Sequence, residues 1–168
     1  MVNQMLGRLH QYFDEDPSVF SHIVVFGGVN DLYSDQTAHR TLPKIERDLT
    51  EMYRLARSHS QVVIAITVAP WGGFRRWYTD DRGRNTGELN QWIEHTHDRG
   101  DTDMVVVSDA VLTCGDPNSL CPALMPPFHD GLHFGTEGHR KLGEALLTAL
   151  GASACEGLKP SVKPNVSE

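Results

Sequence analysis

The sequence has no apolar run long enough to cross a bilayer, and its first residues lack the basic, apolar and small-residue order of a signal peptide. Basic residues are also few: 15 Lys and Arg stand against 22 Asp and Glu, which gives a formal net charge of −7. An acidic surface repels nucleic acid and anionic lipid, so neither is expected as the main partner. The composition, with 39% hydrophobic and 22% charged residues over 168 residues, is that of one globular domain. The compartment stays unknown; secretion or the periplasm would follow if a signal segment lay upstream.

Cysteine is scarce, with Cys114, Cys121 and Cys155 as its three occurrences. The first two flank the loop 115–120, which is short enough to be closed by a disulfide. Two unrelated thiols in a polar loop are the alternative. No Cys-x-x-Cys pair is present, so structural zinc is not expected.

Four potential metal ligands gather towards the C-terminus, namely His129, Asp130, His133 and His139. His129 and His133 have the i, i+4 spacing with which a helix can chelate a metal. Gly131, between them, and two prolines just before them oppose a helix at this place. We therefore expect no metal and no cofactor.

Apolar periodicity divides the chain into alternating helices and strands. Buried strands are expected at residues 22–27, 61–68 and 104–107. Helices are expected at 2–13, at 42–57, from a capping box at Asn85 and Glu88, and from Thr136 onward, with a proline-rich loop at 108–129. This alternation is typical of an α/β protein with an open parallel sheet and right-handed crossovers. We expect one domain at 1–150 and a flexible tail at 151–168.

Two short motifs fall at the carboxyl edge of this sheet, where the chemistry of open α/β proteins gathers. In the first, Gly28-Val29-Asn30-Asp31, the amide of Asn30 at a strand tip can donate hydrogen bonds to a developing oxyanion. The alternative is a turn residue, and Asp31 is expected to stabilise that turn rather than to take part in chemistry.

The second motif is Asp130-Gly131-Leu132-His133, just before the last helix. It offers a general base, His133, and a carboxylate that fixes its tautomer, Asp130. A histidine near a helix start with a capping aspartate is the alternative.

Together these motifs resemble the third and fifth blocks of the SGNH (GDSL-type) serine hydrolases. Further likeness lies at 68–71, 89–93 and 138–143, so that the resemblance covers about 23–150. It implies a three-layer, flavodoxin-like α/β sandwich with a mainly parallel sheet. It also implies an ester hydrolase, esterase- or lipase-like or a glycan O-deacetylase, that acts by Ser-His-Asp acyl transfer on a small-molecule, glycan or lipid ester. His133 and Asp130 would be catalytic, and Asn30 would belong to the oxyanion hole.

The nucleophile of that family is missing from the sequence. No serine follows a strand in a Gly-Asp-Ser or Gly-x-Ser-x-Gly context, and Ser108, which ends the third strand, is the least unsuitable substitute. Three explanations stay open: the serine lies upstream, with one or more N-terminal strands of the fold; another polypeptide supplies it; or the protein is a non-catalytic relative that serves as a ligand-binding or interaction domain. The lack of a capping residue before the first helix favours the first explanation.

The loop 71–84 is rich in glycine, arginine and aromatic residues. An aromatic lid over an acyl or sugar pocket is one interpretation, and a loop that buries its own aromatics is the other. Under the first, Trp71 and Trp77, together with Gly28, would contact substrate.

Loss of a neighbouring strand would leave residues 23–26 at the edge of the sheet. An unpaired apolar edge is a template for pairing with another chain, so self-association through it is expected.

Overall fold

A parallel sheet of three strands forms the centre of the computed structural model, which describes residues 1–156. The strands are β1 (Phe20–Phe26), β2 (Ser60–Ile66) and β3 (Met104–Val106), in the spatial order β1-β2-β3. Val24 of β1 lies opposite Ile64 of β2, which lies opposite Met104 of β3. The predicted α/β class and the three predicted strands are confirmed.

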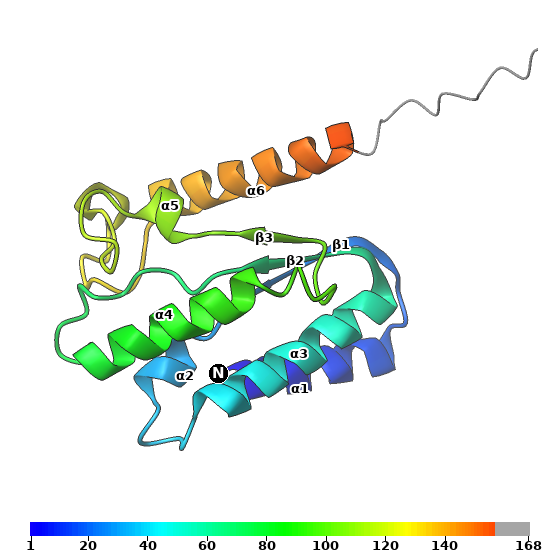
Figure 1. Cartoon of the computed structure of the whole chain (residues 1–168), viewed down its shortest axis with the longest axis horizontal. Coiled ribbons are helices and arrows are strands. Elements are labelled where there is room, and N and C mark those ends of the chain that lie inside the picture. Colours follow the sequence, from blue (N-terminus) through cyan, green and yellow to red (C-terminus); the bar gives the residue numbers. More distant parts are fainter. Residues whose placement is uncertain (157–168) are drawn as a thin grey trace, which may run out of the picture.

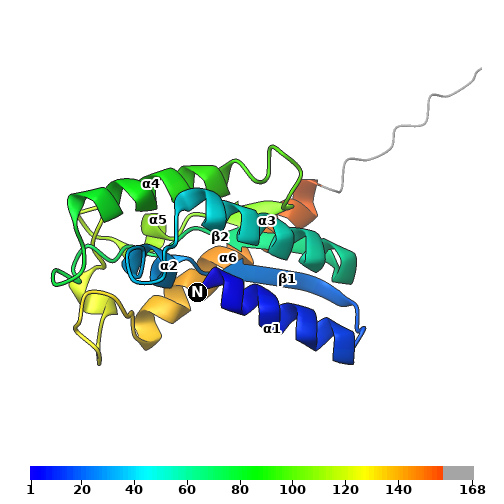
Figure 2. The same cartoon turned by 90° about the horizontal axis from the view of Figure 1, so that it is seen from below.

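Helices cover both faces of the sheet (Figure 1). The helices α1 (Val2–Glu15), α3 (Leu42–His59) and α4 (Asp80–Glu94) lie on one face, and α6 (Thr136–Glu156) lies on the other, as Figure 2 also shows. Strand β2 is buried on both faces. Val63 and Ala65 belong to the core with α3 and α4, whereas Ile64 and Ile66 belong to the core with α6. An apolar strand between two helical layers is what its uninterrupted β-branched sequence predicts.

Strand β1 forms one edge of the sheet within residues 1–156, as predicted for residues 23–26. Its pairing partner is β2, along one side only. Val25 is 4% exposed against the helices, whereas Val24, which points to the opposite face, is 41% exposed. β1 therefore presents an unpaired backbone edge beside a partly open apolar face.

The predicted start of α4 at Asn85 is wrong. The helix begins at Asp80, because the Thr79 hydroxyl accepts a hydrogen bond from the Arg82 amide and caps the helix there. The sequence between the two positions contains Gly83 and reads as a loop, which hid the earlier start.

Helix α6 begins at Thr136 as predicted but continues to Glu156, past the point where the tail was expected to begin. The rest of the expected tail, 157–168, lies outside the described residues. No helix within residues 1–156 is both long and apolar enough to span a membrane.

Three short helices occupy segments that were predicted as turn or loop. They are α2 (Val29–Tyr33), which begins inside the Gly-x-Asn-Asp motif, and α5 (Asp109–Leu112) and the 3₁₀ helix η1 (Pro122–Leu124), which interrupt the loop 108–129. Each is too short for apolar periodicity to reveal.

A buried charge network joins α2 to α1 and α3. Asp31 is 0% exposed; its Oδ2 accepts a hydrogen bond from the Val2 amide at 2.8 Å and its Oδ1 accepts one from Arg40 Nε at 2.6 Å. Arg40 also donates to Asp48 on α3 at 2.7 Å. Burial raises the pKa of Asp48, but hydrogen bonds from Arg40 and Arg47 outweigh it and lower that pKa. Asp31 thus connects three helices, a wider role than stabilising its own turn.

Candidate active site

The two residues of the Asp-x-x-His motif are hydrogen-bonded to each other. His133 Nδ1 lies 2.6 Å from Asp130 Oδ2. Asp130 Oδ1 accepts hydrogen bonds from the amides of Leu132 at 2.9 Å and of His133 at 2.8 Å. The carboxylate therefore holds both the backbone and the ring of the histidine, while the His133 side chain stays 61% exposed. With Nδ1 donating to Asp130, Nε2 is the ring atom that is available as an acceptor.

The Asp130 carboxylate is held in its charged form. Partial burial raises its pKa, but the hydrogen bonds from the His133 ring and from the two amides outweigh burial, and the pKa falls to about 2. Because folding lowers this pKa, the charged Asp130 carboxylate stabilises the folded protein. This stabilisation is fully present above pH 3.8, the ordinary pKa, and is lost as the pH falls through about 2. At neutral pH the turn therefore carries a fixed negative charge next to the imidazole.

Close backbone packing fixes the turn that carries this pair. Gly131 has a φ of 77°, and a Cβ atom there would lie 2.1 Å from the carbonyl carbon of Gly73. The amide of the preceding residue, Gly72, donates to the carbonyl oxygen of Asn118 at 2.6 Å. Asn118 lies in the loop that a disulfide between Cys114 and Cys121 closes, so the first of the two alternatives for these cysteines is confirmed. The disulfide loop thus supports the Asp130–His133 turn through the backbone at 72–73.

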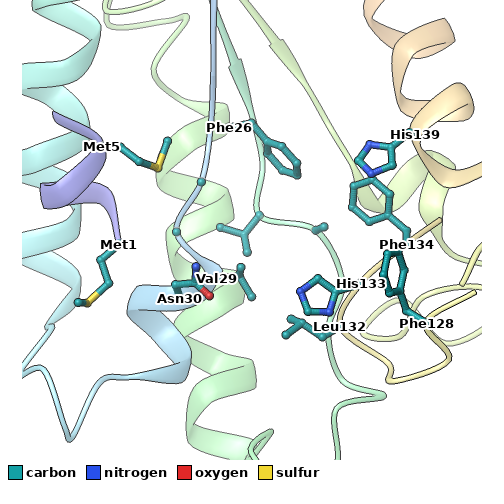
Figure 3. A pocket seen from close by; sticks show the side chains of 14 residues that line it. Met1, Met5, Phe26, Val29, Asn30, Phe128, Leu132, His133, Phe134 and His139 are labelled. Atoms are coloured by element: carbon teal, nitrogen blue, oxygen red, sulfur yellow. The ribbon is translucent and has the colours of Figure 1, made fainter. Parts of the chain in front are cut away.

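Asn30 and His133 line one cavity, which has a volume of about 390 Å³. Figure 3 shows Asn30 on α2 and His133 on the loop before α6, facing each other across the cavity. The remaining lining is mostly apolar: Met1, Met5, Phe26, Gly27, Gly28, Val29, Val68, Ala69, Phe128, Leu132, Phe134 and His139. The cavity thus combines an apolar wall with a few polar groups, the usual character of a small-ligand site.

Local geometry explains the glycine that precedes Asn30. Gly28 caps α2 with a φ of 124°, and a Cβ atom there would lie 3.0 Å from a methyl group of Val68. The tight turn brings Asn30 into the first turn of α2 at the tip of β1. Asn30 is exposed, and among the described residues its side-chain amide has no hydrogen-bond partner. Its amide hydrogens are therefore free to bind a ligand.

No serine, threonine or cysteine lines this cavity within the described part of the chain. Ser108 is 0% exposed, and its hydroxyl lies 3.0 Å from that of Thr67 and 3.2 Å from the carbonyl oxygen of Val68. Ser108 thus connects the ends of β2 and β3 from a buried position. It is therefore not placed to act as the nucleophile, the role for which it was the least unsuitable serine in the sequence.

The two tryptophans assigned to substrate contact lie outside the lining of the cavity. Trp71 is 1% exposed, and its indole N–H donates to Thr86 at 3.0 Å, so it is a packing residue of the core. Trp77 is half-buried and forms a T-shaped pair with Tyr33 of α2, with ring centroids 5.2 Å apart. Of the three residues assigned to substrate contact, only Gly28 borders the cavity.

Most residues of the apolar wall were not predicted from the sequence. Phe128 and Phe134 lie in or next to an irregular loop, Phe26 ends a strand, and Met1 and Met5 lie at the start of α1. No periodic pattern links residues that come from such different segments.

Over residues 1–156, no group of three or more His, Cys, Asp or Glu side chains is arranged to hold a metal ion.

Residues 2–141 match the model of the GDSL-like Lipase/Acylhydrolase family. No curated protein sequence matches the chain.

Several solved structures have a similar fold. A protein described as an acylhydrolase from Bacteroides fragilis has a TM-score of 0.74 at 19% identity, over 91% of this chain and 71% of that one. A GDSL-like lipase from Bacteroides thetaiotaomicron has a TM-score of 0.70 at 21% identity, over 94% of this chain and 72% of its own. A mutant of an acetyl-xylooligosaccharide esterase from Geobacillus has a TM-score of 0.61 at 18% identity, over 87% and 67%. At these identities the similarity establishes the fold.

Proposed function

Because the chain belongs to the GDSL-like Lipase/Acylhydrolase family, we propose that it provides the histidine, aspartate and oxyanion donor of an ester hydrolase whose nucleophilic serine lies outside residues 1–168. One observation carries this proposal. Asn30 and the hydrogen-bonded pair His133–Asp130 are about a hundred residues apart in sequence, yet Asn30 and His133 line the same apolar cavity.

Each of the three side chains has a defined part in the proposed reaction. The serine hydroxyl attacks the ester carbonyl carbon while His133 Nε2 takes its proton, and Asp130 stabilises the imidazolium that forms. The carbonyl oxygen becomes negative, and the Asn30 amide donates a hydrogen bond to it. When the carbon–oxygen bond of the ester breaks, His133 returns the proton to the leaving alcohol. Water then hydrolyses the acyl-serine by the same route, which regenerates the serine.

The cavity limits the group that is bound beside the reacting carbon. A volume of about 390 Å³ is at the small end of ligand sites, and the lining near His133 is apolar, with Phe128, Leu132 and Phe134. A short acyl group on a small-molecule, glycan or lipid alcohol fits this description.

The unpaired edge of β1 supports a source for the serine outside residues 1–168. Phe26 and Gly27, at the carboxyl end of β1, both line the cavity. A further strand paired in parallel along that edge would end at this cavity and could place a serine beside His133. The same edge could instead pair with β1 of a second copy of the chain.

A non-catalytic ligand-binding domain is the second candidate function, and the absence of a nucleophile from the described lining favours it. A fluorophosphonate that labels activated serines separates the two. The 168-residue chain alone should acquire no adduct in intact-mass spectrometry and should not hydrolyse 4-nitrophenyl acetate. The same chain expressed with the residues encoded in frame before Met1 should acquire one adduct, on a serine in the added segment.

Two outcomes contradict this proposal. An adduct on any serine of residues 1–168 would identify a nucleophile within the chain. Labelling of neither protein would favour the ligand-binding domain.

A further inference from the structure

Two adjacent arginines differ from nearly all the others in the chain. Arg75 and Arg76 form no ion pair within the described residues, whereas every other arginine except Arg8 pairs with a carboxylate. Of the two carboxylates that follow closely in sequence, Asp81 pairs with Arg84, and Asp80 forms no ion pair with either arginine. In a chain of net charge −7, two unpaired guanidinium groups side by side are a local exception.

Arg76 is held in a geometry that suits an anion. Its guanidinium carbon lies 5.1 Å from the centroid of the Trp77 ring, within the range of a cation–π contact. Arg99 makes the same kind of contact with Trp92, at 4.7 Å, and its guanidinium also binds the carboxylate of Asp101 at 3.0 Å. A stacked guanidinium keeps its in-plane N–H donors free for a carboxylate or phosphate. Arg76 therefore has the arrangement of Arg99 without the anion.

The aromatic platform beneath Arg76 is the ring of Trp77, and neighbouring residues hold it in place. Arg82 donates to the carbonyl oxygen of Trp77 at 2.6 Å and to Asp35 at 2.6 Å. The hydrogen bond from Arg82 lowers the pKa of Asp35, so this carboxylate is charged and engaged with Arg82. Tyr33 packs against the Trp77 ring in a T-shaped arrangement. Little conformational freedom remains for Trp77 to lose when a ligand binds Arg76.

The loop that carries Arg76 and Trp77 also packs against the turn of the candidate active site, and Trp77 contacts α2. The Arg75 amide donates to the carbonyl oxygen of Gly73, the residue that packs against Gly131 in the Asp130–His133 turn. Tyr33 lies one helical turn after Asn30 on α2. Figure 1 shows the loop between β2 and α4 at the same end of the sheet as α2 and the loop that leads into α6.

We propose that Arg76, with Arg75 beside it, binds an anionic group on the non-reacting part of the ester, so that the substrate class is an ester carrying a carboxylate, sulfate or phosphate. That the ester reacts at His133 rests on the proposed function, whereas anion binding at Arg76 does not depend on a nucleophile. The charge would set the orientation of the ester and select against neutral esters.

The test is a titration of the ¹⁵N-labelled 168-residue chain near neutral pH, followed by NMR. The probes are monomethyl adipate, an ester with one carboxylate, and dimethyl adipate, its neutral counterpart. Monomethyl adipate should shift the resonances of the Arg76 Nε–H and of the Trp77 indole, and dimethyl adipate should leave them in place. Arg76→Gln should raise the dissociation constant for monomethyl adipate at least about tenfold. Arg8→Gln removes the third unpaired arginine, on α1, and should leave that constant unchanged.

Equal binding of both esters, no binding of monomethyl adipate, an unchanged constant in Arg76→Gln, or an equal loss in Arg8→Gln would each overturn the proposal. Because these measurements need no turnover, they can fail while the serine-labelling experiment succeeds, or succeed while that experiment fails.

Discussion

Asp31→Asn should destabilise the protein strongly although Asp31 has no place in the proposed chemistry. The substitution keeps the size of the side chain and an oxygen for the Val2 amide, but it removes the charge that faces Arg40 at 2.6 Å. The Asp31 and Arg40 side chains are 0% and 7% exposed, so water cannot replace the lost partner. Removing one partner of a buried ion pair costs about 3–5 kcal/mol. Because Arg40 keeps Asp48, we expect the lower end, about 3 kcal/mol, which lowers the melting temperature by roughly 6–12 °C in a chain of this size.

Urea unfolding followed by circular dichroism measures this loss, and Asp81→Asn is the matched control. Asp81 also pairs with an arginine, Arg84, but their side chains are 79% and 66% exposed. A surface pair of this kind contributes at most about 1 kcal/mol. If the two variants lost the same free energy of unfolding, the buried network would not be what joins α2 to α1 and α3.

Three further predictions concern the candidate site. Gly131→Ala should destabilise the protein by about 2–5 kcal/mol, because the new Cβ would overlap Gly73 and the backbone there is left-handed. Gly143→Ala is the control, because Gly143 on α6 has open space around it, and it should not destabilise the protein. Equal urea unfolding curves for the two variants would refute this. The Asp130 carboxyl should titrate at about pH 2 in ¹³C NMR, and a midpoint at its ordinary 3.8 would show that its hydrogen bonds are not formed in solution. In protein that carries the upstream residues, Asn30→Ala should lower kcat about 10²–10³-fold with little change in KM, and an unchanged kcat would remove Asn30 from the oxyanion hole.

Local sequence signals predicted the parts of the fold that local physics decides. The apolar run of β2 is buried on both faces because it lies between two helical layers, and no other position suits such a run. The His133–Asp130 contact is likewise short-range, since a three-residue spacing in a tight turn brings the ring to the carboxylate.

Long-range packing decided the rest. Asp31 was predicted to stabilise its own turn, because nothing in the sequence indicates that Arg40 and the Val2 amide both bind its carboxylate. Trp71 is a second example. It lies in a glycine-rich loop, where no periodic pattern shows whether an aromatic side chain covers a pocket or is buried in the core. Only the packing of α4 and the hydrogen bond to Thr86 place it inside.

The proposed function assigns His133 the role of general base in an ester hydrolase and Asp130 the role of holding its ring. The most direct measurement is the rate of 4-nitrophenyl acetate hydrolysis by protein that includes the residues encoded before Met1, compared between His133→Ala and His139→Ala. Both histidines line the cavity, but only His133 has a carboxylate partner at 2.6 Å. His133→Ala is expected to abolish turnover nearly completely, whereas His139→Ala should lose far less. Equal losses in the two variants, or turnover that survives in His133→Ala, would contradict it.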